Sequence, residues 1–343
     1  MTFFPIPSFF EAARVGEVWR VPYQERAVQA AAWAAEQGIQ AAASDLPRVG
    51  LLIIDMQNTF CLPEFELYVG GRSGRGAIED ATRLCEFIYR NLGRLTQIIA
   101  TLDTHLSVQI FHPIFWLNSA GEHPAPVTVV TAAAVRSGAW QVNPAIAANF
   151  PGWTLASLQE YALHYVEQLE ASGKYPLTVW PYHGKLGGIS HALVSAVEEA
   201  CFFHSIARSS QTLYETKGDN PLTENYSVLR PEVMCDRAGN PIARANKALC
   251  DRLLEFDALI VAGEAKSHCV AWTVADLLAE IQQRNPSWAQ KVYLLDDCSS
   301  PVTIPGVVDY TEAAEAAYAK FAAAGMQRVK STESLEVWPG FPT

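Results

Sequence analysis

The residues with the clearest chemical potential are a cysteine and several polar side chains that follow strand-like segments. Cys269 comes after an apolar, strand-like run (257–263) and a short turn, directly before a helix-like segment. The free N–H groups and the positive end of the dipole at a helix start favour a thiolate. Cys269 is therefore a candidate nucleophile. The competing interpretation is that this thiol only packs in the core, as free cysteines commonly do.

A carboxylate stands at the end of another predicted strand. Asp55 ends the continuous apolar run 49–55. Next to a thiol it could act as general base and then as acid to the leaving group. As a lone aspartate it could equally cap a turn. Ligands of open α/β sheets bind beyond the carboxyl ends of the strands, so reactive side chains at several strand ends indicate a site there.

Asp103 and His105 form a candidate metal site with a third residue. They follow the predicted strand 96–103 and lie two positions apart, so in an extended chain they point to the same side. His183 follows the predicted strand 176–180 and is the candidate third ligand. One carboxylate and two imidazoles leave open positions, as catalytic metals require. The other histidines are treated as bystanders, and His112 is the least clear of these exclusions.

Alternating strands and helices predict an α/β fold with a doubly wound, mostly parallel, six-stranded sheet and helices on both faces. The sequence shows no internal repeat. The predicted strands are 49–55, 96–103, 176–180, 257–263 and 291–297, and the predicted helices are 24–43, 76–94, 154–172, 187–208, one that starts near Cys269, and 309–324.

Two segments fall outside this alternation. Residues 1–48 are predicted to be an N-terminal helical extension, and residues 49–343 the main domain. The stretch at about 106–175 is longer than an ordinary connection and is predicted to be an insertion with a function of its own, such as a lid or an oligomer contact. Because small doubly wound enzymes often assemble, the prediction is a homo-oligomer.

Composition excludes several classes of protein. The chain of 343 residues is 50% hydrophobic and 18% charged, with a net charge of −11 and no basic stripe, so we expect no nucleic-acid partner. Its seven cysteines are scattered and form no CxxC pair, which argues against a disulfide framework. We expect no signal peptide, no membrane partner and a location in the reducing cytoplasm.

Five segments together resemble the isochorismatase-like cysteine hydrolases, and nicotinamidases most closely. They are IleIleAspMetGlnAsnThrPhe (53–60), AspThrHis (103–105), TrpProTyrHis (180–183), LysGlyAspAsnProLeuThrGluAsnTyrSer (217–227) and GlyGluAlaLysSerHisCysVal (263–270). The order of the five is specific, although each alone is weaker. Three positions depart from the family pattern: Thr104 replaces a tryptophan, Gly184 often a cysteine, and His268 often a tyrosine or valine. These departures bear on the substrate more than on the reaction.

The resemblance implies roles for the site residues. Cys269 would be the nucleophile, Asp55 its base, and Lys217 the catalytic lysine, although by itself Lys217 would be read as a surface residue. The peptide Glu264–Ala265 would be cis, and the N–H groups of Ala265 and Cys269 would form the oxyanion hole.

The resemblance also implies a cofactor and a substrate. Asp103, His105 and His183 would hold one divalent metal, with Zn²⁺ expected first and Fe²⁺ or Mn²⁺ as alternatives, and no organic cofactor is expected. Phe60 and Trp180 would flank a pyridine ring, although core packing explains both equally well.

The implied reaction is hydrolysis of a small primary amide through a thioester, with nicotinamide giving nicotinic acid and ammonia. Two alternatives stay open. One is another small substrate on the same fold, either a ureido or carbamoyl compound or isochorismate. The other is a catalytically silent binding or scaffold protein.

Overall fold

The computed structural model describes residues 3–342, so the ends of the predicted extension (1–2) and of the predicted domain (343) lie outside the description. A central sheet of six parallel strands has the order β10-β7-β6-β1-β2-β5. This confirms the predicted doubly wound α/β class. The strands are β1 (Val49–Ile54), β2 (Gln97–Asp103), β5 (Leu213–Lys217), β6 (Ala258–Gly263), β7 (Val292–Leu295) and β10 (Gln327–Val329).

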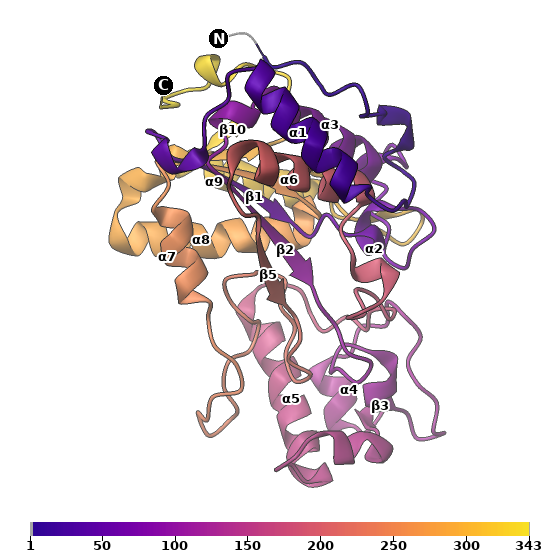
Figure 1. Cartoon of the computed structure of the whole chain (residues 1–343). Coiled ribbons are helices and arrows are strands. Elements are labelled where there is room, and N and C mark those ends of the chain that lie inside the picture. The colour runs from indigo at the N-terminus through magenta and orange to yellow at the C-terminus, as the bar shows by residue number, and fades with distance from the viewer. Residues whose placement is uncertain (1–2, 343) are drawn as a thin grey trace.

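Helices cover both faces of the sheet (Figure 1). Alternate residues of β1 point to opposite sides: Leu51 and Ile53 join the core with α3 (Gly76–Arg90) and α6 (Ser195–Arg208). Leu52 and Ile54 join the core with α7 (Lys247–Leu254), α8 (Ala271–Arg284) and α9 (Thr311–Ala323). All six residues of β1 and of β6 are buried, as expected for central parallel strands.

The N-terminal extension packs against the outside of one helical layer. Helix α1 (Tyr23–Glu36) lies along α6, and both ends of the described chain lie near this layer (Figure 1). Arg26 Nε pairs with Glu199 Oε1 at 2.6 Å, and the Arg26 guanidinium stacks 3.9 Å above the ring of Phe9. The extension is thus held by a buried ion pair and aromatic contacts.

The insertion forms a lobe beyond the carboxyl ends of β2 and β5, at the foot of Figure 1. It contains the hairpin β3 (Trp116–Leu117) and β4 (Gln141–Val142) and the helices α4 (Ala132–Arg136) and α5 (Leu155–Ser172). The remaining elements are the short helix α2 (Asn58–Cys61) and the hairpin β8 (Thr303–Ile304) and β9 (Val308–Asp309). Among residues 3–342, no helix is long and apolar enough to cross a membrane.

One predicted strand is wrong. Residues 176–180 do not join the sheet, and only a single bridge between Val129 and Thr178 forms there. Leu177 and Val179 are buried, but they pack with the insertion, and their backbone groups bond residues 127–130. Strands β5 and β10, at the two edges of the sheet, were missed. The helices α1, α3 and α6 are also shorter than the predicted ranges 24–43, 76–94 and 187–208.

Candidate active site

Four neighbouring strands deliver the candidate catalytic residues to one edge of the sheet. Asp55 follows β1, Asp103 ends β2, Lys217 ends β5, and β6 leads into the loop of Cys269. The register pairs Asp103 with Lys217 across β2 and β5. By itself Lys217 would be read as a surface residue, so its burial at the end of β5 is a correction that strengthens the strand-end argument.

The loop before Cys269 is held tightly against β1. Gly263 has φ +125, and a Cβ there would lie 2.0 Å from the carbonyl oxygen of Ile54, so only glycine fits this close approach. The peptide Glu264–Ala265 is cis. A π-helical turn (Lys266–Val270) follows and continues directly into α8. Cys269 therefore stands at the entrance of a long helix, as its sequence context indicates.

Two buried carboxyl groups, Glu264 and Asp80, belong to the support of this loop. Each has one carboxyl oxygen without a hydrogen-bond partner among residues 3–342. Burial, and then the neighbouring Asp80, raise the pKa of Glu264 well above its usual range. Ser300 N donates to Glu264 Oε2 at 3.2 Å, and Arg83 pairs with Asp80 at 2.7 Å. The raised pKa favours the neutral form of Glu264, which lowers the repulsion between the two neighbouring carboxyl groups.

Lys217 is the centre of the candidate catalytic cluster. Its Nζ lies 2.9 Å from Asp55 Oδ2, 2.8 Å from Asp103 Oδ1 and 3.5 Å from Cys269 Sγ. It also donates to the carbonyl of Asn225 at 3.0 Å. The structure thus brings together the three residues predicted to be catalytic, although Lys217 was expected only from the resemblance.

Burial sets the resting protonation of this cluster. It raises the pKa of the Cys269 thiol well above its usual range, although Lys217 opposes the shift. Burial also raises the pKa of Asp55, although the positive charge of Lys217 acts to lower it. Burial lowers the pKa of Lys217, but Asp103 and Asp55 outweigh it and hold that pKa well above normal. The raised pKa of the thiol favours its protonated form, and Asp55 is the neighbouring carboxyl group that would accept its proton.

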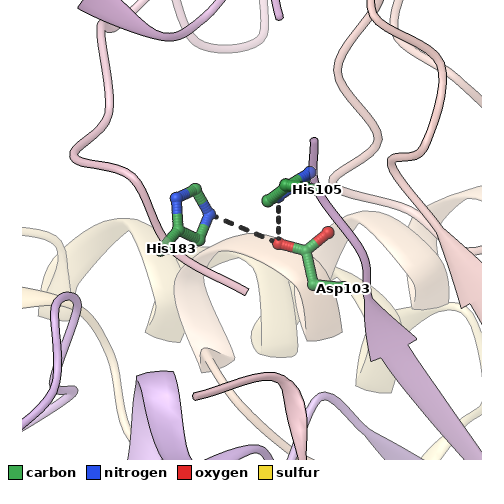
Figure 2. A group of neighbouring side chains, drawn as sticks. All are labelled: Asp103, His105 and His183. Carbon is green, nitrogen blue, oxygen red and sulfur yellow. Dashed lines mark hydrogen bonds and ion pairs between the residues drawn. The ribbon is translucent and has the colours of Figure 1, made fainter. Parts of the chain in front are cut away.

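Asp103, His105 and His183 converge beside the cluster (Figure 2). Asp103 Oδ2 lies 2.8 Å from His105 Nε2 and 3.5 Å from His183 Nε2. His105 Nδ1 bonds the carbonyl of Gly218 at 2.9 Å, and His183 Nδ1 bonds that of Pro181 at 2.8 Å. A carbonyl only accepts, so both Nδ1 atoms carry hydrogen. In the neutral rings, both Nε2 lone pairs then face the carboxylate.

This donor set fits a divalent cation. Lone pairs that point at a carboxylate oxygen are satisfied when a metal lies between them, and the backbone bonds to Nδ1 are the usual outer support of such ligands. One carboxylate and two imidazoles suit Zn²⁺, Fe²⁺ or Mn²⁺. The backbone at Gly218 closes one side, because a Cβ there would lie 2.6 Å from His105 Cε1.

Loss of His183 should remove the metal without disturbing the pair between Lys217 and Asp103. In the variant His183→Ala we expect metal affinity to fall more than about 100-fold, since even outer-shell changes cost 10–100-fold. Metal content per chain after dialysis against graded chelator measures this. The matched control is His112→Gln. The His112 ring lies 6.0 Å from that of His183 but outside the donor set, so this variant should keep its metal. Equal metal content in wild type and His183→Ala would contradict the site.

A cavity of about 160 Å³ opens in front of Cys269. A cavity of about 150 Å³ holds benzene, so this one has room for a single six-membered ring. Phe60 and Trp180 both line it, and the Phe60 ring lies 5.8 Å from that of His183. The metal ligands and Ala265 line it as well. The N–H of Ala265 has no acceptor within residues 3–342.

Part of the wall comes from residues that the sequence did not indicate. They are Glu66, Leu67, Tyr68, Val69, Glu224, Asn225, Tyr226, Val302 and Ile304. His268 also lines the cavity, and the sequence indicated it only as a departure from the family pattern that bears on the substrate. Glu224 and Tyr226 belong to the segment 217–227, where the only signal was their nearness to Lys217. None of the lining residues belongs to the insertion 106–175. The insertion instead supports the wall: Tyr161 donates to the carbonyl of Leu222 at 2.9 Å, and Tyr165 accepts from Glu224 N at 3.1 Å.

Comparison with solved structures shows the same fold in nicotinamidases. The yeast nicotinamidase bound to the inhibitor nicotinaldehyde has a TM-score of 0.50 and 17% identity, over 82% of this chain and 99% of that one. A nicotinamidase and pyrazinamidase of Acinetobacter baumanii has a TM-score of 0.48 and 17% identity, and the match covers 84% of this chain and 99% of that one. A pyrazinamidase of Pyrococcus horikoshii in complex with zinc has a TM-score of 0.44 and 17% identity, over 83% and 99%.

No family model and no curated protein matches the sequence. The structural neighbours are nicotinamidases, pyrazinamidases and an isochorismatase-family protein from Desulfovibrio vulgaris, at 14–17% identity for those compared. At that identity the likeness establishes the fold. The chain has a three-layer α/β fold, which it shares with the yeast nicotinamidase.

Proposed function

We propose that the protein is a cysteine amidohydrolase that releases ammonia from a small primary amide on a ring, with nicotinamide as the first substrate to test. The observation that carries the proposal is the contact of Lys217 with Asp55, Cys269 and Asp103, the last two of which line a ring-sized cavity. A thiol, a carboxylate and a lysine so placed serve nucleophilic catalysis. A binding protein has no need to bury all three.

The reaction begins with transfer of the Cys269 proton to Asp55. The Lys217 ammonium stabilises the thiolate, which attacks the amide carbon and forms a tetrahedral oxyanion. Asp55 then returns the proton to the leaving nitrogen, and ammonia departs from a thioester on Cys269. Water attacks the thioester with Asp55 as base, and the carboxylic acid leaves as the thiol is restored.

The backbone supplies the donors for the oxyanion. The N–H of Ala265 has no acceptor within the described chain, and Ala265 lines the cavity beside Cys269. The N–H of Cys269 itself is the second candidate donor. One such donor typically contributes about 10²–10³ in rate.

The proposal names a ring amide because the metal ligands and the nucleophile line the same small cavity. Asp103, His105 and His183 would hold the ion, and a bound divalent ion supplies a Lewis acid that positions a ring nitrogen. Phe60 and Trp180 line the same cavity and are proposed to flank that ring. The ion is proposed to be Zn²⁺, with Fe²⁺ and Mn²⁺ as alternatives.

Ammonia release from a panel of amides tests this function. The panel contains nicotinamide, pyrazinamide, benzamide and a ureido compound, each with metal-loaded protein. We expect nicotinamide and pyrazinamide to be hydrolysed, and benzamide at least about tenfold more slowly, because it lacks the ring nitrogen. Ammonia release from the ureido compound alone would show that the substrate is a ureido compound and not a ring amide. No release from any amide would contradict an amidohydrolase.

The homo-oligomer and the cytoplasmic location stay predictions.

A further inference from the structure

One wall of the cavity carries polar groups that amide hydrolysis does not use. This polar wall consists of Trp180, Glu224, Tyr226 and His268, all of which line the cavity. Glu224 is only 6% exposed, and its Oε1 accepts from Trp180 Nε1 at 2.8 Å. A carboxyl group inside a small cavity costs free energy unless it has partners, so its presence needs a reason.

Hydrogen bonds within the protein hold the side chains and backbone of the polar wall in place. The Tyr226 hydroxyl hydrogen-bonds Glu224 and also accepts from Trp180 Nε1 at 3.3 Å. The backbone of Glu224 is fixed at both ends, by the Tyr165 hydroxyl at 3.1 Å and by Glu232 N at 2.9 Å. Tyr165 belongs to α5, so the insertion helps to hold Glu224 in place.

His268 adds another polar side chain to the wall, and one of its ring nitrogens has no partner among the described residues. It is 5% exposed, its Nδ1 bonds Ser267 Oγ at 2.8 Å, and its Nε2 has no hydrogen-bond partner among residues 3–342. Its ring packs 4.5 Å from that of Tyr175 and 5.5 Å from that of Tyr226. The imidazole is thus fixed on the wall of the cavity, and its Nε2 is a buried polar atom that no described residue satisfies.

The chemistry of this wall suits hydrogen bonding to a neutral ligand. Burial, and then the nearby Glu232, raise the pKa of Glu224 well above its usual range. Burial lowers the pKa of His268 to about 3. A neutral carboxyl both donates and accepts, and so does a neutral imidazole.

Nicotinamide does not use these groups. Its amide belongs at Cys269 and its ring nitrogen at the metal set, which leaves only C–H groups for the rest of the cavity. A site built to hydrogen-bond a substrate group discriminates strongly against the analogue that lacks it, because its own polar groups then stay unpaired.

We propose that Glu224, with His268, makes the cavity select ring amides that carry a second hydrogen-bonding substituent, a hydroxyl or an amino group. The inference rests on the proposed function for the amide at Cys269. It deepens that function, because it names the substituent that the natural substrate carries.

Binding of matched ring amides tests the proposal without turnover. The compounds are pyridine-3-carboxamides that carry a hydroxyl, an amino or a methyl group at each free ring carbon. A methyl group has nearly the size of the other two and cannot hydrogen-bond. Affinities are measured by calorimetry with zinc-loaded Cys269→Ala protein. At one ring position, we expect the hydroxyl or amino compound to bind at least about tenfold more tightly than its methyl partner.

Variants of Glu224 show whether this residue causes the preference for hydroxyl and amino compounds over methyl compounds. Glu224→Leu should abolish that preference. Trp180 Nε1 is not left without an acceptor in this variant, because it still donates to the Tyr226 hydroxyl. Glu224→Gln should retain the preference, since an amide also donates and accepts. The matched control is Glu232→Gln. Glu232 is another buried carboxyl, paired with Lys174 at 3.0 Å, but it does not line the cavity, so this variant should keep the preference.

The outcomes separate this proposal from the general function. A preference that disappears only in Glu224→Leu supports the proposal, whether or not wild-type protein releases ammonia in the separate assay. Equal affinity for hydroxyl, amino and methyl compounds overturns it, even if all are hydrolysed. Failure of every compound to bind, or a preference that survives in Glu224→Leu, overturns it as well. If the leucine variant does not fold, the comparison of hydroxyl, amino and methyl compounds on the Cys269→Ala protein with Glu224 intact still decides.

Discussion

Replacement of Cys269 by alanine should abolish ammonia release from every amide that the wild-type protein hydrolyses. The thiol is the only nucleophile of the described chain placed between Lys217 and the cavity. Loss of a catalytic nucleophile in a hydrolase costs up to about 10⁶ in kcat, so we expect a loss of at least about 10⁴-fold. Steady-state ammonia assays over several enzyme concentrations measure it.

Another buried cysteine provides the control. Cys298 is fully buried near the end of β7 and does not line the cavity, so Cys298→Ala should lose stability but keep kcat within a few-fold. Mass spectrometry after a brief reaction should also find an acyl group on Cys269 in wild type and none in Cys269→Ala. Hydrolysis at the wild-type rate by the alanine variant would rule out the thioester route.

The central strands could be predicted from the sequence because burial on both faces leaves a plain signal. β1 and β6 are continuous apolar runs, and each is buried throughout. The edge strand β5 has no such signal, because Tyr214 and Thr216 face solvent and only Lys217 is buried. The run at 176–180 misled for the opposite reason. It is apolar because it packs on the insertion, and burial alone does not distinguish a sheet from a loop.

The catalytic residues could be predicted more fully than the walls of the cavity. Asp55, Asp103 and Cys269 follow strands or precede a helix, so local patterns locate them. Glu224 and His268 face the cavity only because distant segments fold around them. Tyr165 of α5 holds the backbone of Glu224, and Tyr175 packs on the His268 ring. No periodicity within 217–227 carries that information. Tertiary packing decides which side chains of a loop face a ligand.

The insertion therefore has a structural task that its length alone did not specify. It was predicted to act as a lid or an oligomer contact. In the structure, Tyr161 and Tyr165 bond the segment that follows Lys217, and no residue of 106–175 lines the cavity. The insertion thus fixes the loop that carries Glu224 and Tyr226. The lid and oligomer functions stay predictions.

Replacement of Lys217 by methionine should cost both activity and stability. Methionine keeps an apolar stem of similar length and removes the charge. Asp55 and Asp103 would then face each other as buried carboxylates without their shared cation. Removal of one partner from a buried ion pair typically costs about 3–5 kcal/mol. We expect unfolding at clearly lower denaturant concentration and a loss of at least about 10³-fold in kcat/KM, since the thiolate also loses its nearest positive charge.

A double variant separates the two effects. In the double variant Lys217→Met with Asp55→Asn, a neutral amide replaces one of the two carboxylates that lost their cation. Most of the lost stability should therefore return. Activity should not return, because the general base is gone. Chemical denaturation and ammonia assays on the wild type, both single variants and the double variant form a complete cycle.

A partly buried lysine that is paired with another carboxylate shows whether the loss of activity is specific. Lys174 pairs with the buried Glu232 at 3.0 Å, away from Cys269. Lys174→Met should therefore lose stability while kcat/KM stays within a few-fold of wild type. Were Lys217→Met to retain full activity, the lysine would be a structural counter-ion only, and the thiolate would need another stabiliser. Recovery of activity in the double variant would instead remove Asp55 from the mechanism, because asparagine cannot accept the thiol proton.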